Sequence, residues 1–495
     1  MNYTRRRFLR TGAAASAALL LPNALQLLAF RAAAAAASGN PAEGLARGYG
    51  PLVSDSAGLL DLPAGFQYRA FSTALLGSLD DLRFTQRLSN GELVPARHDG
   101  MAAFPGMPGI TVLVRNHELE PQHKPVLAPG HTMGYDPMGT GGTTTLWVSA
   151  DRELLRSFPS LAGTFRNCAG GPTPWGSWLS CEECTYTPGP KDPVLFDQRP
   201  DVSKRHGYVF EVDSRAEGLV EARPIKAMGR FYHEAVALDA STGFVYLTED
   251  REDGLLYRYR PDAITHRRRR VADMVVGDLA LGGTLEALRI VGLPAARTQN
   301  RTAREFVTGK TWPVDWVTIP NIDPDVDMER DPGDVETPPL ERKARTAPTS
   351  VRAQGFGLGA AQFARCEGIT FHRHSLYFCA TNGGPAKAGQ VWRLELASQR
   401  LSLVAEPDDL ALLDGPDNLT PAPNGDLIVC EDGKDVDYLV GITPNGRLYH
   451  LARNAHNETE FAGACFSPDG RTLFVNIQDP GITFAIWGPW EKRVA

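Results

Sequence analysis

The sequence predicts an all-β fold: a six-bladed β-propeller with a few short helices and long inter-blade insertions. Two observations lead to this prediction. Short runs of β-branched and aromatic residues, separated by Gly, Asn, Asp and Pro, recur along the chain. Two of these runs share one order of turn and strand residues, and they begin 45 residues apart, at Pro423 and Pro468. A repeat of this length is typical of propeller blades.

The predicted strands are short, and turn residues bound most of them. They cover residues 109–115, 207–213, 243–248, 254–260, 375–380, 390–395, 425–430, 446–451 and 470–476. Helical periodicity is sparse, and only residues 284–291 and 408–413 permit short helices. Residues 312–353 are rich in Pro, Asp, Glu and Arg, so we expect a long insertion between blades at about residues 296–353.

The N-terminus has the pattern of a Tat export signal, which we assign to residues 1–37. Arg5, Arg6 and Arg7 precede an apolar stretch and an alanine run that ends at Ala37. Pro22 and Asn23 interrupt the apolar stretch, so a cleaved signal fits better than a retained membrane anchor. We therefore expect a periplasmic or extracellular protein, with residues 38–495 forming one β-propeller domain.

The charge of the exported chain argues against nucleic acid as a partner. The first 37 residues contain five arginines and no acid, so the remainder has 46 basic and 58 acidic residues, a net charge of −12. Phosphate backbones require clustered cations. An acidic surplus instead suits a protein that carries bound metal cations.

Acidic residues gather next to predicted strands, where loops from separate blades converge on the central channel of a propeller. Converging carboxylates repel one another unless cations neutralise them, which indicates hard metals such as Ca²⁺. Taken singly, each acid is better explained as ordinary surface charge, so the prediction depends on the whole set. The set comprises Glu118, Glu182, Glu183, Glu234, Glu367, Asp417, Glu431, Asp432 and Glu460.

Cys168 lies in the most unusual stretch of the sequence, residues 163–183, which is rich in Gly, Pro and Trp. This composition predicts a rigid, irregular loop. A thiolate among carboxylates would favour a transition metal over Ca²⁺ alone, although loop cysteines are commonly buried and inert. Cys181 and Cys184 form a single CxxC pair without the second pair that a zinc ribbon needs.

From about residue 48 to residue 481, the chain resembles the PhoX-type alkaline phosphatases, which are exported by Tat and built as β-propellers. The resemblance depends on short motifs in a fixed order. They are residues 98–101 (HDGM), 116–118 (NHE), 167–176 (NCAGGPTPWG), 181–183 (CEE), 233–235 (HEA), 365–367 (RCE), 416–418 (PDN) and 460–463 (EFAG).

This resemblance implies a cofactor of two Fe(III) and three Ca(II) ions, with a cysteine thiolate linking the irons and an oxo group touching iron and calcium. Cys168 matches the bridging cysteine, and Arg365 matches the arginine that would hold the substrate phosphate. We assign catalytic roles to Cys168 and Arg365, and substrate contacts to Arg365 and Asn167. The matched metal ligands are Cys168, Glu183, Glu234 and Glu367, with Glu118, Asp417 and Glu460 as further candidates.

The implied reaction is hydrolysis of small phosphomonoesters, in which cations and Arg365 neutralise the phosphoryl oxygens. We expect a monomer whose export partner is the Tat translocon, with no stable membrane association after cleavage. Two alternatives stay open. One is another Ca²⁺-dependent propeller hydrolase, such as a lactonase or phosphotriesterase. The other is a non-catalytic propeller that Ca²⁺ stabilises and that binds a partner.

Overall fold

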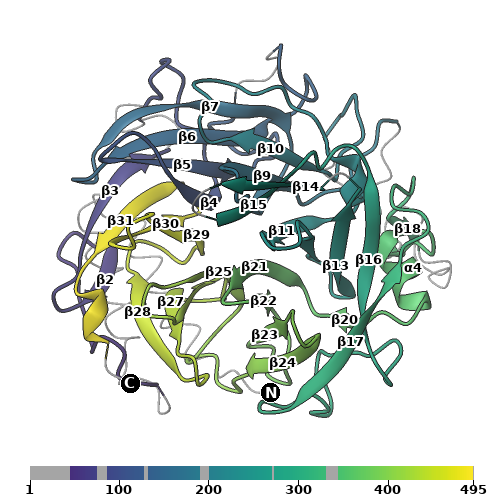
Figure 1. Cartoon of the computed structure of the whole chain (residues 1–495). Coiled ribbons are helices and arrows are strands. Elements are labelled where there is room, and N and C mark those ends of the chain that lie inside the picture. Colours follow the sequence, from purple (N-terminus) through teal and green to yellow (C-terminus); the bar gives the residue numbers. More distant parts are fainter. Residues whose placement is uncertain are drawn as a thin grey trace, which may run out of the picture.

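The computed structural model describes residues 45–74, 86–127, 132–189, 200–262, 264–269, 272–330 and 344–493. Antiparallel sheets stand around a central axis in the manner of propeller blades (Figure 1), which confirms the predicted all-β, propeller-like arrangement. The predicted Tat signal, residues 1–37, lies outside the described residues. Among the described residues, no helix is long and apolar enough to cross a membrane.

Two sheets are built from strands that follow one another along the chain, in the orders β4–β5–β6–β7 and β8–β9–β10. Their strands are β4 (His98–Pro105), β5 (Ile110–His117), β6 (Gly141–Ser149), β7 (Leu154–Thr164), β8 (Asn167–Pro172), β9 (Ser177–Glu182) and β10 (Val209–Asp213).

A larger sheet joins two further groups of strands through β17 (Thr311–Thr318), which pairs with β16 at one end and with β24 at the other. Its remaining strands are β11 (His233–Leu238), β12 (Val245–Glu249), β13 (Gly254–Pro261), β16 (Gly283–Ile290), β20 (Gln362–Phe363), β21 (Cys366–His372), β22 (Ser375–Ala380), β23 (Gln390–Glu395) and β24 (Arg400–Ala405).

N-terminal strands complete the two sheets that end the chain. The sheet orders are β1–β2–β28–β27–β26–β25 and β29–β30–β31–β3, so both outer edges come from early sequence. The strands are β1 (Leu52–Val53), β2 (Leu60–Pro63), β3 (Gln67–Thr73), β25 (Pro416–Pro421), β26 (Leu427–Glu431), β27 (Tyr438–Ile442), β28 (Leu448–Asn454), β29 (Phe461–Phe466), β30 (Thr472–Ile477) and β31 (Ile482–Trp487).

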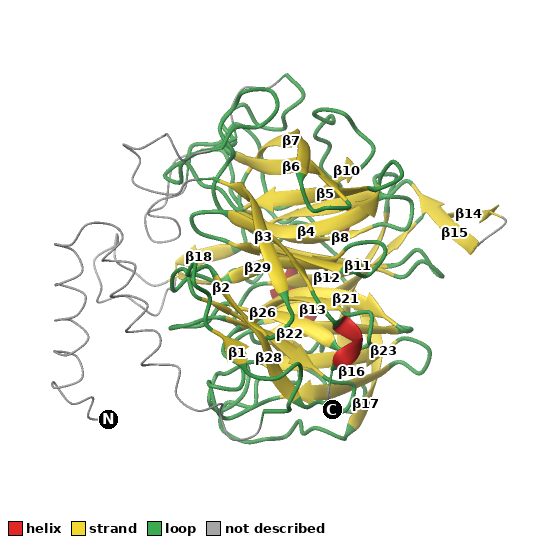
Figure 2. Cartoon of the chain, turned by 90° about the vertical axis from the view of Figure 1, so that its left-hand side faces the viewer, coloured by secondary structure: helices red, strands yellow, loops and turns green. Residues whose placement is uncertain are grey.

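The remaining elements of the described residues are two hairpins and three short helices. The β14–β15 hairpin projects from the body of the molecule (Figure 2). These elements are β14 (Ile264–Arg269), β15 (Ala272–Gly277), β18 (Met328–Arg330), β19 (Ala344–Thr346), η2 (Lys226–Met228), α4 (Val351–Gly357) and η3 (Trp490–Lys492).

The predicted strands coincide with strands of the structure, and the 45-residue repeat places β26 and β30 at the same position in neighbouring sheets. The two predicted short helices are wrong. Residues 284–291 fall on β16, which is paired on both edges, and residues 408–413 form turns. The predicted insertion at residues 296–353 includes β17, which belongs to the large sheet.

The innermost strands contact one another in a closed order, β4, β8, β11, β21, β25, β29 and back to β4. Glycines allow these backbones to lie close together. A Cβ atom on Gly171 of β8 would lie 1.9 Å from the carbonyl oxygen of Val236 on β11. A Cβ atom on Gly100 of β4 would lie 2.5 Å from the Cα atom of Ala169 on β8. The ring around the central axis therefore depends on residues without side chains.

A buried ion cluster fixes the loops beside β9. The Nδ1 atom of His206 lies 2.6 Å from Glu182 Oε1, and its Nε2 atom lies 3.2 Å from Asp136 Oδ2. Glu182 also accepts the backbone N–H of Gly207, and Asp136 accepts that of Ser203. Burial lowers the pKa of His206, but the charges of Glu182 and Asp136 outweigh it and raise the pKa to about 9.

We predict that Gly171→Ala destabilises the protein by about 3 kcal/mol, because the new methyl group would overlap the β11 backbone. The midpoint of denaturant-induced unfolding measures this loss. Gly218→Ala is the matched control, since a Cβ atom there has no neighbour within 4 Å. Equal midpoints for the two variants would contradict the close approach of β8 and β11.

We also predict that the free energy of unfolding decreases as the pH rises from His206's unfolded pKa of about 6.5 to its folded pKa of about 9. A raised folded-state pKa stabilises the native protein fully below the lower value, and this stabilisation is lost through the higher one. Denaturant unfolding at successive pH values checks this. His206→Gln should flatten the decrease across this window.

His372→Gln is the control, because burial lowers the pKa of His372 and it titrates below the window. An unchanged pH profile in His206→Gln would show that the imidazole is neutral between its two carboxylates.

Candidate metal centre

Each innermost strand carries a β-bulge near its first residues, where two residues oppose one on the neighbouring strand. A bulge turns a side chain out of the normal alternation of a strand. The first bulged residue in five of these strands lines one cavity on the central axis. These residues are Asp99 on β4, Cys168 on β8, Glu234 on β11, Glu367 on β21 and Asp417 on β25.

A second set of cavity residues comes from positions directly after the second strand of a strand group. The backbone N–H of the residue after that strand donates to the carbonyl oxygen of the residue before the inner strand, as from Glu118 to Arg97 at 3.0 Å. The same bond joins Glu183 to Arg166 at 2.9 Å, and it recurs around the ring. Five residues after second strands reach the cavity, namely Glu118, Glu183, Asp250, Asp432 and Gln478.

The cavity has a volume of about 410 Å³ and is strongly acidic. Ten acidic residues line it, against the three arginines Arg97, Arg166 and Arg365. Three subsets bring their ligand atoms within 4.8 Å of one another: Cys168 with Glu183 and Glu234, Asp99 with Glu118 and Glu460, and Glu234 with Glu367 and Asp417. Such convergence of thiol and carboxylate groups is the geometry of a metal site.

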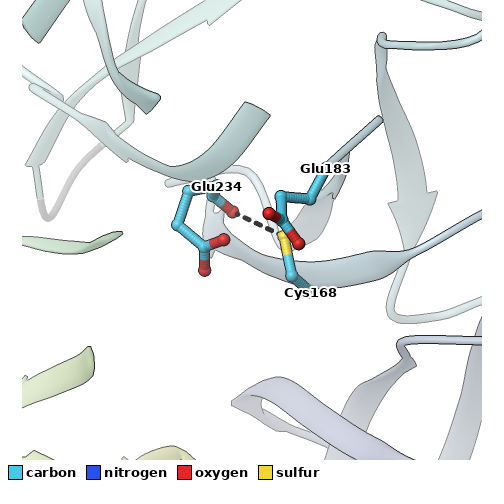
Figure 3. A group of neighbouring side chains, drawn as sticks. All are labelled: Cys168, Glu183 and Glu234. Carbon is cyan, nitrogen blue, oxygen red and sulfur yellow. Dashed lines mark hydrogen bonds between the residues drawn. The ribbon is translucent and has the colours of Figure 1, made fainter. Parts of the chain in front are cut away.

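The sulfur of Cys168 lies beside the carboxylate of Glu183 (Figure 3). Its thiol also contacts the carbonyl oxygens of His233 at 3.3 Å and Glu234 at 3.4 Å. Burial and the charge of Glu234 raise the pKa of the thiol well above its usual value. Without a cation the thiol is therefore protonated, and a bound cation would be needed to hold it as a thiolate.

Several carboxylates of the cavity also have raised pKa values. Burial and the charge of Glu367 raise the pKa of Glu234 well above its usual value. Burial raises the pKa of Glu183 to about 8 and that of Glu367 to about 7, although Arg166 and Arg365 respectively oppose the shift. Among the described residues, the carboxylate of Glu234 has no hydrogen-bond donor or cation as a partner. The missing positive charge is what bound metal ions would supply.

Arg365 is held rigidly at the cavity wall. Its Nε and one terminal nitrogen each donate to Asp250, both at 2.9 Å. The same terminal nitrogen lies 2.5 Å from Glu367 Oε1, as an ion pair outside hydrogen-bond geometry. A bidentate pair of this kind fixes the guanidinium plane and leaves its other terminal nitrogen for a further anion.

Among the cavity carboxylates, Glu118 is paired with two arginines. Arg97 donates to its Oε2 at 2.6 Å, and Arg166 lies 3.0 Å from its Oε1. Arg166 also donates to Glu183, so it links two of the three ligand groups. Burial raises the pKa of Glu118, but Arg166 and Arg97 outweigh burial and lower it overall.

The structure brings together all the predicted metal ligands and Arg365 in this cavity. Asn167 lies apart from them. Its side chain accepts a hydrogen bond from Thr164 and donates to Ser180 at 2.9 Å, so its surroundings give no support to the predicted substrate contact. Glu182 and Glu431 of the acidic set also lie outside the cavity lining and accept backbone N–H groups.

Sequence reasoning missed Asp99, Asp250, Arg97, Arg166 and Gln478 as cavity residues. A signal for the first four exists in the sequence. Arg97, Arg166 and Arg365 each stand two residues before a bulged ligand, in the repeated pattern Arg, any residue, then Asp, Cys or Glu. Asp250 directly follows β12, most of which lies in the predicted strand 243–248, as Glu183 directly follows β9.

Comparison with known proteins shows which family and which solved structures the chain is similar to. The family described as alkaline phosphatase PhoX matches residues 47–156 and 148–481. PhoX of Pseudomonas fluorescens, solved with the transition state analogue vanadate, shares 18% identity and a TM-score of 0.61, covering 90% of this chain and 98% of that one. A gluconolactonase of Xanthomonas campestris shares 12% identity and a TM-score of 0.36, covering 89% and 98%.

A comparison with curated protein sequences finds no match. The likeness to the Pseudomonas fluorescens structure supports the propeller fold. The family match spans nearly all of the described residues, including every cavity residue named above. The chain therefore belongs to the PhoX alkaline phosphatase family, whose members are phosphoric monoester hydrolases.

Proposed function

We propose that this chain releases phosphate from phosphomonoesters with a cluster of Fe(III) and Ca(II) ions anchored by Cys168. One observation carries the proposal: Cys168, Glu183 and Glu234 form a compact buried ligand group in the same cavity as Arg365. The cavity thus combines a thiol and carboxylates with a guanidinium, which are groups that hold metals and phosphate respectively.

The donor set fits a mixed cluster. Cys168 with Glu183 and Glu234 offers sulfur and oxygen, which suits iron, whereas the other two groups offer oxygen alone, which suits Ca²⁺. Glu234 belongs to two of these groups, so its carboxylate would contribute to holding the ions of both. When bound, the cations supply Lewis-acid stabilisation of the phosphoryl group and activation of the attacking oxygen.

Arg365 grips the phosphate of the substrate in this proposal. Asp250 holds one edge of its guanidinium, and the free terminal nitrogen can donate to a phosphoryl oxygen. The backbone carbonyl of Arg365 accepts the N–H of Thr381, the residue after β22. The equivalent residues beside Arg97 and Arg166 are Glu118 and Glu183. Arg365 therefore has no carboxylate partner at that position. Pseudomonas fluorescens PhoX binds vanadate, and we infer that a phosphoryl group occupies this cavity in the same way.

The proposal extends to the architecture and the place of action. We infer six blades, because six innermost strands of the described chain contact one another in a closed ring. We also propose export by the Tat translocon, guided by residues 1–37, and action in the periplasm or outside the cell as a monomer on small phosphate esters. Residues 38–495 then form one catalytic propeller.

We predict that the natively produced protein contains iron and calcium and hydrolyses nitrophenyl phosphate at alkaline pH. Cys168→Ser should lose iron and almost all activity, because a serine hydroxyl does not replace a soft thiolate ligand. Elemental analysis and initial rates measure both effects.

Cys465→Ser is the matched control, since Cys465 is also buried but does not line the cavity. Retained activity in Cys168→Ser would favour a different propeller hydrolase. Calcium without iron, together with no hydrolysis by the unmodified protein, would favour a binding propeller.

We predict that Arg365→Lys lowers kcat/KM for nitrophenyl phosphate at least about tenfold, the effect of losing one charge-assisted hydrogen bond. Lysine retains the charge but lacks the fork that pairs with Asp250 and phosphate together. Metal content should stay unchanged, because Arg365 is not a candidate ligand. Arg69→Gln, at an exposed pair with Glu153, is the control. Unchanged kinetics in Arg365→Lys would exclude its contact with phosphate.

A further inference from the structure

Three arginines occupy the same strained position around the cavity. Arg97, Arg166 and Arg365 each directly precede an innermost strand, with φ values of 52°, 45° and 54°. Gly415, before β25, has the same left-handed conformation at φ 64°. For a residue with a Cβ atom, this conformation costs roughly 1–2 kcal/mol. An arginine kept at such a position, with its side chain lining a cavity, indicates a functional side chain.

The three guanidinium groups differ in how completely they are paired. Arg365 is locked by Asp250, as described above. Arg166 donates its Nε to the carbonyl oxygen of Glu183 at 2.9 Å and also pairs with three carboxylates, those of Glu118, Glu120 and Glu183. Among the described residues, Arg97 hydrogen-bonds to Glu118 alone, and its Nε has no partner. A guanidinium has five N–H groups, so Arg97 retains most of them for another acceptor.

Arg97 also lies across the channel from Arg365. Its strand, β4, is three places from β21 in either direction around the closed order of innermost strands. Both side chains line the same cavity of about 410 Å³, which is large enough for a small ester. A substrate with its phosphate at Arg365 would therefore direct its alcohol portion toward Arg97.

We propose that Arg97 binds a second anionic group of the substrate, so that the enzyme prefers phosphomonoesters whose alcohol portion carries a carboxylate or a further phosphate. This rests on the proposed function, since it places the reacting phosphate at Arg365. Asp99 and Glu460 lie near Arg97 and would repel an anion. Both belong to a candidate metal group, so a cation held there would neutralise them.

The test compares two probes that cannot be hydrolysed, phenylphosphonate and 4-carboxyphenylphosphonate, by titration calorimetry on the metal-loaded protein. We expect the wild-type protein to bind the carboxylated probe about tenfold more tightly, the effect of one charge-assisted hydrogen bond. In Arg97→Gln the two dissociation constants should agree within about twofold. Arg69→Gln is the control and should keep the wild-type preference, because Arg69 pairs with Glu153 at the surface.

Elemental analysis of each variant shows whether its metals are intact. If glutamine at position 97 changes the metal content, Arg97→Lys decides, and its preference should be smaller than that of the wild type because lysine lacks the planar fork. Wild-type protein that binds both probes equally, or a preference that persists in the Arg97 variants, overturns this inference alone. Wild-type protein that binds neither probe overturns the proposed function as well.

Discussion

Electrostatic repulsion within one buried cavity is the constraint on which the rest of the structure depends. Ten acidic side chains share this space with three arginines, and burial together with the charges of neighbouring carboxylates raises the pKa of Glu234, Asp417 and Glu460. In metal-free protein, protonation of carboxylates and of the Cys168 thiol reduces the free energy required to bury these negative charges together. Cations would remove the cost and would add their binding energy to the stability of the fold.

The propeller brings the acidic side chains together by repeating one local arrangement of backbone. In each sheet a bulge turns a residue of the inner strand toward the axis, and a backbone hydrogen bond brings the residue after the second strand beside it. Glycines such as Gly171 and Gly100 then allow neighbouring inner strands to approach. Side chains distant in sequence, such as those of Cys168 and Asp417, thus converge because both lie on bulges of innermost strands.

Much of this could be predicted from the sequence, because strand runs bounded by turn residues and the family motifs are local features. Residues 284–291 permit a short helix in the sequence because Leu285, Glu286, Ala287 and Leu288 have high helix propensity, yet pairing on both edges makes these four residues a strand. Asp99 and Arg97 were missed because a bulge depends on the register between strands, which a single strand does not reveal.

Closure of the ring sets the order in which the cavity can be completed. β3, near the start of the chain, has its sheet partner in β31, near the end, and Glu460 and Gln478 come from the same late segment. Synthesis must therefore proceed past β31 before this sheet can close and the acidic cavity can be complete. A cation that met the chain before this point would find only part of the candidate ligand set.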